Sequence, residues 1–168
     1  MDTHLKTSLW KQYGAAIDTL DDVIGLCPDE LWTAVVWDDD EAPQYGQFWF
    51  IAFHTLSWLD LFLAGSREAY VMPAPFIRGG LPDQPYTKEQ VQGYLVHCRE
   101  TCRTTIEGLT DERARQVCTF PWMEPTYLEL QLYCMRHVME HAGQLGYFLG
   151  RNGVVGMDWV AAARAGDG

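Results

Sequence analysis

The stretch from Thr126 to Gly150 limits the possible fold most strongly, because it has the pattern of one long amphipathic helix. Thr126 and Glu129 have the spacing of a capping box, and Asn152 with Gly153 supplies a stop after the stretch. The residues that recur at helical spacing and therefore share one face are Leu130, Cys134, His137, His141 and Phe148. The rest of this face is apolar, so we expect its two histidines to point into a core and not into solvent.

Three further stretches show the same helical period, which predicts helices at about 5–26, 47–64 and 88–109, with the last helix at 126–151. The third begins with another capping box, formed by Thr87 and Gln90. No stretch shows a convincing period of two residues. Four long amphipathic helices in 168 residues predict an all-α four-helix bundle that spans 1–168 as a single domain.

The connections between these helices differ in length. Residues 66–86 are rich in proline and long enough to run the length of a bundle, so we expect a crossover between helices two and three, which would then be parallel. A looser segment is expected at 110–124. In the tail, 154–168, we expect Trp159 to pack back on the bundle and the last few residues to fray.

Composition excludes several classes of partner. The net charge is −11, and no basic patch stands out, so neither nucleic acid nor an anionic membrane surface is an expected partner. Hydrophobic residues make up 48% of the chain and aromatic residues 13%, which indicates a packed globule. The longest apolar run, at 48–64, is too short and too polar for a membrane span. Five cysteines and an N-terminus without an apolar segment predict a protein of the reducing cytoplasm.

Two smaller motifs have a functional interpretation and a plainer one. The acidic run from Asp38 to Glu41 would either bind a cation or form a solvated loop, since adjacent carboxylates repel and stay hydrated. Cys98 and Cys102 lie one turn apart on the apolar face of the third helix. They are either a metal or redox pair or small buried core residues, and buried cysteine commonly has the second role.

The string from His137 to His141 matches HxxEH, the inverted zincin motif, in which two histidines bind zinc and the glutamate is the base. That motif needs a further protein ligand, a glutamate well downstream. No glutamate follows Glu140 in this sequence, and a protease of that class needs far more chain for a substrate cleft. We therefore favour another interpretation of the pair.

The other interpretation adds His54, which lies among aromatic residues on the inward face of the helix at 47–64. A bundle brings inward faces together, so His54 with the pair His137 and His141 predicts a three-histidine metal site. Three neutral imidazoles suit Zn, Ni or Fe and leave coordination positions for water or substrate. His4 and His97 lie off this constellation and are expected to be structural or solvated.

These residues carry a resemblance to a known family. The chain resembles the DinB family and its YfiT-like relatives, which are four-helix bundles with a histidine in the second helix and an HxxxH pair in the last. The matching segments are IAFHTLSWLD around His54 and RHVMEHAGQLGYFLGR around His137 and His141, including the local HxGQ feature that ends at Gln144. The similarity in helix order and length extends from about Leu5 to Arg151.

The resemblance implies a divalent metal ion at the three histidines, a homodimer, a cytoplasmic location and a small-molecule substrate. The better-understood relatives are transferases and isomerases that use bacillithiol, mycothiol or glutathione. Two more residues are candidate catalytic groups on the last helix. Gln144 would bond a metal-bound water or merely pack, and Glu140 would orient a ligand or accept a proton unless it is a plain surface residue.

Three functions stay open from the sequence. The first is a metal-dependent hydrolase or thiol transferase whose metal activates water or a thiol. The second is a non-enzymatic bundle that binds metal or a small molecule, and the third is a dimeric scaffold without metal. Metal content separates the third from the others, and thiol-dependent turnover separates the first from the second.

Overall fold

The computed structural model describes residues 1–165, and across that range the chain forms helices and isolated bridges but no strand. The predicted fraying of the last few residues concerns 166–168 and lies outside the described part. The long helices are α1 (Thr3–Leu26), α2 (Phe48–Ala64), α3 (Lys88–Glu107) and α5 (Tyr127–Arg151). The short ones are η1 (Asp29–Leu31), η2 (Pro43–Gly46) and α4 (Asp111–Arg115). The predicted all-α bundle is confirmed.

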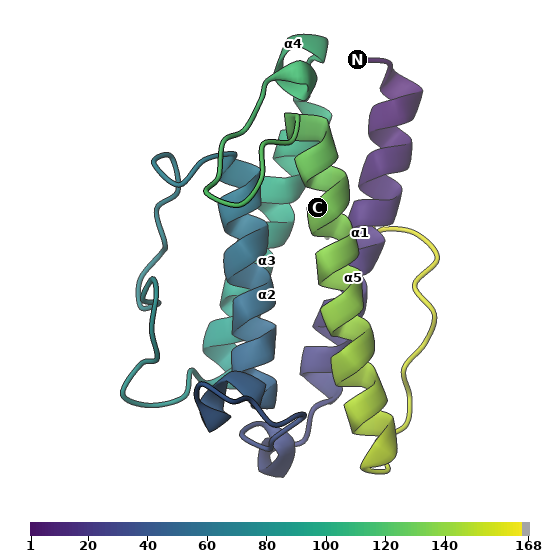
Figure 1. Ribbon diagram of the computed structural model, residues 1–168. Helices are drawn as coiled ribbons and strands as arrows, with labels where there is room; N and C mark the ends of the chain where they lie inside the picture. Colours follow the sequence, from purple (N-terminus) through teal and green to yellow (C-terminus); the bar gives the residue numbers. More distant parts are fainter. Residues whose placement is uncertain (166–168) are drawn as a thin grey trace.

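The four long helices stand side by side, with α2 and α3 running in one direction and α1 and α5 in the other (Figure 1). Helix α5 packs against α1 and α2, and α3 packs against the same two helices from the opposite side. The connection between α2 and α3 travels the length of the bundle along its outer side (Figure 1). This is the crossover that its length predicts.

The helix ends follow local chemistry. Both predicted capping boxes are present, Thr87 with Gln90 on α3 and Thr126 with Glu129 on α5. Helix α1 starts earlier than predicted, because the carboxylate of Asp2 accepts hydrogen bonds from the backbone of the first turn. The looser segment contains a helix that the sequence analysis missed, α4, whose single short turn is too brief to show a period.

Large aromatic side chains fill the interior of the bundle. The largest of the fully buried ones, all less than 2% exposed, are Trp49, Tyr13, Tyr127, Phe48 and Phe62. The five cysteines are all buried and free of disulfide bonds, which places Cys98 and Cys102 in the core. Among the described residues, every helix is too short or too polar to cross a membrane.

The C-terminal tail docks on the bundle, but not through the predicted residue. Trp159 is 83% exposed, so the expectation that it packs back is wrong. Instead the backbone N–H of Ala163 donates to Lys11 O on α1 at 2.7 Å, and that of Arg164 donates to the buried carboxylate of Asp18 at 2.7 Å. Arg99 from α3 pairs with the same carboxylate, so the tail is held by backbone polar contacts that hydrophobicity does not predict.

Candidate metal centre

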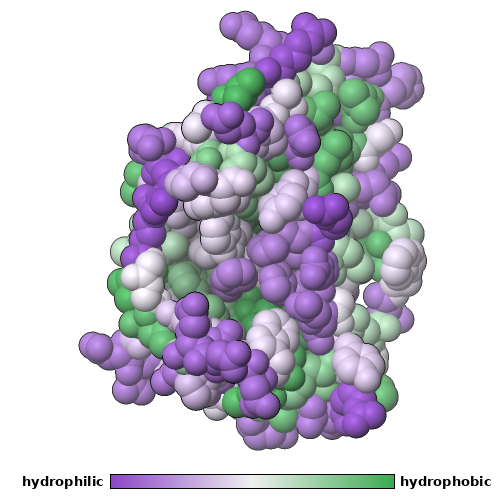
Figure 2. All heavy atoms as spheres, viewed as in Figure 1, coloured by the Kyte–Doolittle hydropathy of each residue, from purple (hydrophilic) through white to green (hydrophobic). Residues whose placement is uncertain are grey.

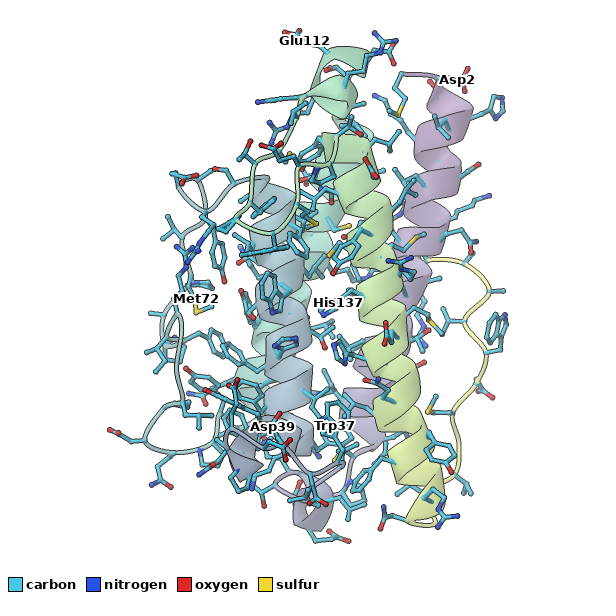
Figure 3. All side chains as sticks on the ribbon, in the orientation of Figure 1. Asp2, Trp37, Asp39, Met72, Glu112 and His137 are labelled. Carbon is cyan, nitrogen blue, oxygen red and sulfur yellow. The ribbon has the colours of Figure 1, made fainter. Side chains whose placement is uncertain are left out.

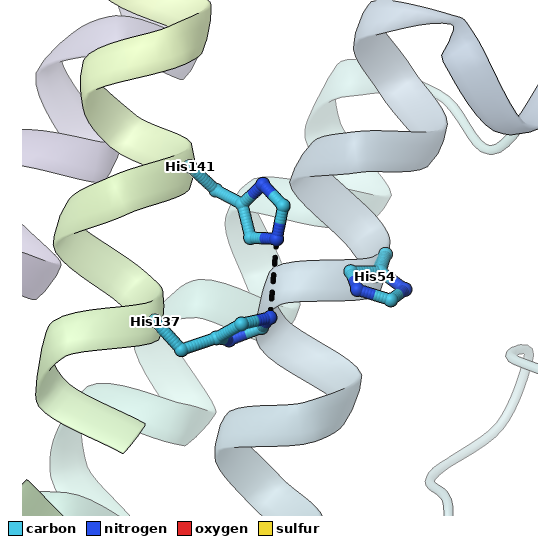
Figure 4. Close-up of side chains that lie close together, drawn as sticks. All are labelled: His54, His137 and His141. Carbon is cyan, nitrogen blue, oxygen red and sulfur yellow. Dashed lines mark hydrogen bonds between the residues drawn. The ribbon is translucent and has the colours of Figure 1, made fainter. Parts of the chain in front are cut away.

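The geometry of α2 and α5 brings the three predicted histidines together. Tyr127 OH and Gln131 Nε2 on α5 donate to the last backbone carbonyls of α2, those of Leu63 (2.6 Å) and Phe62 (2.9 Å). These buried bonds set the register between the two antiparallel helices. Two turns further along, the rings of the three histidines face one another across the gap (Figure 4).

The three side chains form one compact cluster. One ring nitrogen from each of His54, His137 and His141 lies within 4.8 Å of the other two. The ring centroids are 5.6 Å apart for His54 and His137, and 5.3 Å for His54 and His141. His137 Nε2 and His141 Nε2 are 3.1 Å apart.

The cluster lies at the edge of the core, whereas the sequence analysis expected it in the interior of the core. All three histidines are half-buried, whereas the fully buried residues on this part of α5 are their neighbours Val138 and Ala142. The histidine face is rotated away from the centre of the bundle and toward a cleft beside α2. The expectation that the pair avoids solvent is therefore only partly correct, and the rings are accessible to a small ligand.

Burial makes the three imidazoles neutral at physiological pH. Desolvation lowers the pKa of His54 to about 4, with the nearby His141 as a smaller cause. Desolvation followed by the charges of the two other rings lowers the pKa of His137 to about 3. The pKa of His141 is also lowered by burial, against an opposing effect of Gln144 and Glu140. Neutral imidazole is the form that binds metal ions.

Gln144 sets the tautomer of one ring. Its Oε1 accepts a hydrogen bond from His141 Nδ1 at 2.8 Å, which puts the proton on Nδ1 and leaves a lone pair on Nε2. That lone pair faces His137 and His54, as a ligand to a shared ion must. Gln144 thus contacts a histidine, a role that the sequence analysis did not consider, although the i, i+3 spacing signals it.

The donor set fits a divalent metal ion. The Nδ1 atom of His137 is buried without a hydrogen-bond partner among the described residues, where the ring's one hydrogen bond joins its Nε2 to His141 Nε2. Histidine nitrogens bind zinc at about 2.0–2.1 Å, which puts neighbouring donors about 3.0–3.4 Å apart. The 3.1 Å between the two Nε2 atoms lies in this range. Three imidazoles leave positions for an exogenous ligand.

Two cavities that share part of their lining reach the histidines. A cavity of about 560 Å³ is lined by His54 and His141, and a smaller one of about 210 Å³ by His54 and His137. Trp58 and Trp122 line both cavities, and their rings meet edge to face at 5.4 Å between centroids. The face of the molecule shown in Figure 2 is hollowed beside α2, with hydrophobic residues at the bottom of the hollow.

Glu140 and Trp37 lie beside the histidine cluster, and the other two histidines of the chain lie outside it. Glu140 is exposed, and its charge acts to raise the pKa of His141. The ring of Trp37, from the loop after η1, stacks on His141 at 6.4 Å between centroids, a contact that no local pattern predicts. His4 is exposed at the start of α1, and His97 lies on α3 with Nε2 3.9 Å from Asp60. Both are outside the cluster, as expected.

Comparison with known proteins places the chain in a family. No curated protein and no solved structure matches it with significance. The family model described as DinB superfamily matches residues 12–145, which is most of the chain and includes His54, His137 and His141. Together with the helical bundle, this match shows that the chain belongs to the DinB superfamily.

Proposed function

We propose that this protein is a metal-dependent enzyme whose three histidines hold a divalent ion, Zn, Ni or Fe, that activates a small nucleophile. The observation that carries the proposal is the convergence of three neutral imidazoles, with ring nitrogens within 4.8 Å of one another, at the wall of an open cavity. A purely structural metal site has its ligands completed by the protein, whereas open positions are typical of catalytic sites.

When bound, the ion supplies Lewis acidity, which lowers the pKa of a coordinated water or thiol. The protein's residues then have separate tasks. His54, His137 and His141 bind the ion. Gln144 keeps the proton of His141 on Nδ1 and so keeps Nε2 available, and Glu140 is our candidate for orienting a ligand or accepting a proton. The aromatic side chains of the cavity give the centre apolar walls against which a substrate can pack.

The two cavities favour thiol transfer over hydrolysis. A hydrolase needs room for one organic substrate, whereas a transferase must bind two organic molecules at one centre. Here His141 lines one cavity and His137 lines the other, and His54 borders both. We therefore propose a low-molecular-weight thiol, such as bacillithiol, mycothiol or glutathione, as the co-substrate. The competing proposal is a non-enzymatic bundle that binds metal or a small molecule.

The decisive experiment is elemental analysis of protein purified without a nickel column. We expect about one divalent ion per chain in the wild type, and loss of that ion in His54→Ala, His137→Ala and His141→Ala, since two imidazoles bind too weakly. The matched controls His4→Ala and His97→Ala should keep the ion. A metal-free wild type that also fails to take up added zinc would refute the proposal and leave a scaffold.

Turnover separates the enzyme from the binding protein. Metal-loaded protein should consume a thiol together with an electrophilic acceptor, at a rate that falls to background in His137→Ala. Binding of metal without thiol-dependent turnover of any acceptor would favour the non-enzymatic alternative. We further propose a cytoplasmic location, supported by five free cysteines, and a homodimer, supported by exposed apolar side chains such as Tyr147 and Trp159.

A further inference from the structure

The cavity of about 560 Å³ has the size and lining of a site for a small organic molecule. Such sites span about 300–1,000 Å³ and combine apolar walls with a few polar groups that orient the ligand. Its floor is α2, with Phe50, Phe53 and Trp58, and its outer wall is the crossover between α2 and α3. Figure 3 shows Met72 on this outer wall, at the left of the view, and Trp37 and Asp39, which also line the cavity, near the lower end of α2.

Two arginines from the crossover line this cavity, Arg67 and Arg78, and both are exposed. Arg78 is held in place, because its Nη1 donates to Arg67 O at 3.2 Å and its Cζ lies 5.5 Å from the centroid of the Tyr70 ring. Within the described range 1–165, no carboxylate oxygen lies within 4.0 Å of a guanidinium nitrogen of Arg67 or Arg78. The two positive charges therefore have no ionic partner among the residues that the structure describes.

The acidic groups of the cavity lie on a different segment. Asp39 and Glu41 come from the loop between η1 and η2. Asp39 is engaged locally, because its Oδ1 accepts hydrogen bonds from the backbone N–H groups of Glu41 (3.0 Å) and Ala42 (3.2 Å). Asp39 thus shapes the loop, and the positively charged groups of the cavity with which an anion can pair are the two arginines of the crossover.

We propose that this cavity binds the acceptor substrate, and that the substrate is a small carboxylic acid with an aromatic or aliphatic body. The carboxylate pairs with Arg67 and Arg78, and the body packs on the aromatic floor. The other end of the molecule then faces His54 and His141. This placement rests on the proposed metal-dependent function, but the binding of the acid does not require the ion.

The test uses metal-free protein, prepared with a chelator, so that a carboxylate cannot bind through an ion. The probes are 2-naphthoate and its neutral analogue 2-naphthamide, which share a body and differ in charge. Binding is measured by calorimetry in wild type, Arg67→Gln, Arg78→Gln and the double variant. Arg151→Gln is the matched control, because this exposed arginine at the end of α5 does not line the cavity.

We expect the wild type and Arg151→Gln to prefer naphthoate over naphthamide by about tenfold or more, since a hydrogen bond to a charged group contributes on the order of 1.5 kcal/mol. Each single variant should lose part of this preference and the double variant all of it, while naphthamide binding stays within twofold. An unchanged preference in the double variant would overturn the proposal, as would equal binding of the two probes by the wild type.

The zinc content of the same variants separates this inference from the proposed function. Arg67→Gln and Arg78→Gln should bind zinc as the wild type does, because neither residue contacts the histidines' ring nitrogens. If the charge preference is present but the wild type binds no zinc, the carboxylate site exists and the metal proposal fails. If zinc binds but the charge preference is absent, the metal proposal survives and the substrate class is wrong.

Discussion

Replacing Gln144 tests whether this residue supports metal binding by orienting His141. In Gln144→Leu, the Nδ1–H of His141 loses its acceptor at 2.8 Å, and the ring is half-buried, so water compensates only in part. A lost neutral hydrogen bond costs about 1 kcal/mol, and leaving a buried donor unpaired costs about 1–3 kcal/mol. Because this bond is present without metal too, its loss weakens zinc binding by leaving the ring free to turn or to change tautomer, and removing such a partner usually lowers metal affinity about 10- to 100-fold.

A second variant, Gln144→Glu, should not lower the zinc affinity. In Gln144→Glu a carboxylate accepts from the same Nδ1–H, and a charged acceptor makes a hydrogen bond roughly twice as strong as a neutral one. The zinc affinity of Gln144→Glu should therefore equal or exceed that of the wild type at pH 7.5. Affinities are measured by competition with a chromophoric zinc chelator. Gln92→Leu, a half-buried glutamine on α3 away from the cluster, is the control and should bind as the wild type does.

Two results would contradict this role of Gln144. Wild-type zinc affinity in Gln144→Leu, within twofold, would mean that the bond seen to His141 does not orient a ligand. A weaker affinity in Gln144→Glu than in Gln144→Leu would mean that the 144 side chain acts on the ion directly or by packing alone. A fold control is needed for both, and circular dichroism of each variant supplies it.

Three other predictions concern stability and assembly. In metal-free protein the pKa of His54 lies below its unfolded value of 6.5, so the stability that neutral His54 contributes is complete above pH 6.5 and is lost as pH falls toward 4. Between pH 7.5 and 4.5 this loss should lower the free energy of unfolding by about 2–3 kcal/mol. Urea titrations of His54→Leu should show an acid-induced loss that is smaller by about this amount, because His137 and His141, whose pKa values are also lowered, still contribute theirs. Gly93→Ala on α3 should raise the free energy of unfolding by about 0.5–1 kcal/mol, because nothing lies within 4 Å of the new methyl group. Gly14→Ala should not stabilise the protein, because its methyl group would lie 2.4 Å from Ala163 Cβ and displace the tail. Limited proteolysis would detect this displacement as faster cleavage near the C-terminus. Sedimentation should give a homodimer at micromolar concentration, and a species of 19.2 kDa alone would contradict this expectation.

Local patterns predicted the helices well because each depends on residues close in sequence. A capping box needs only two side chains three positions apart, so the starts of α3 and α5 follow from Thr87 and Thr126. The length and proline content of 66–86 likewise predict a crossover and hence parallel α2 and α3. The sequence analysis did not predict α4, because this helix spans only Asp111–Arg115 and is too short to show a helical period.

The sequence alone also determined which residues are candidates for the centre. His137 and His141 share a face because they are four residues apart on a helix, and His54 is the one histidine of α2. What periodicity cannot determine is how a helix is rotated against its neighbours. Only the packing of α5 on α2 decided that this face borders a cavity, so the histidines are half-buried at its wall and not enclosed in the core.

Contacts between distant segments depended entirely on the tertiary structure. Trp37 stacks on His141, and Arg67 and Arg78 line the cavity, although all three come from irregular segments that have no period. Trp159 is exposed, and the tail docks through the backbone of Arg164 on Asp18. The hydrophobicity of the Trp159 side chain does not predict this contact. Local sequence thus determined the helices and the candidate ligands, and long-range packing decided what those ligands face, because orientation is a property of pairs of elements.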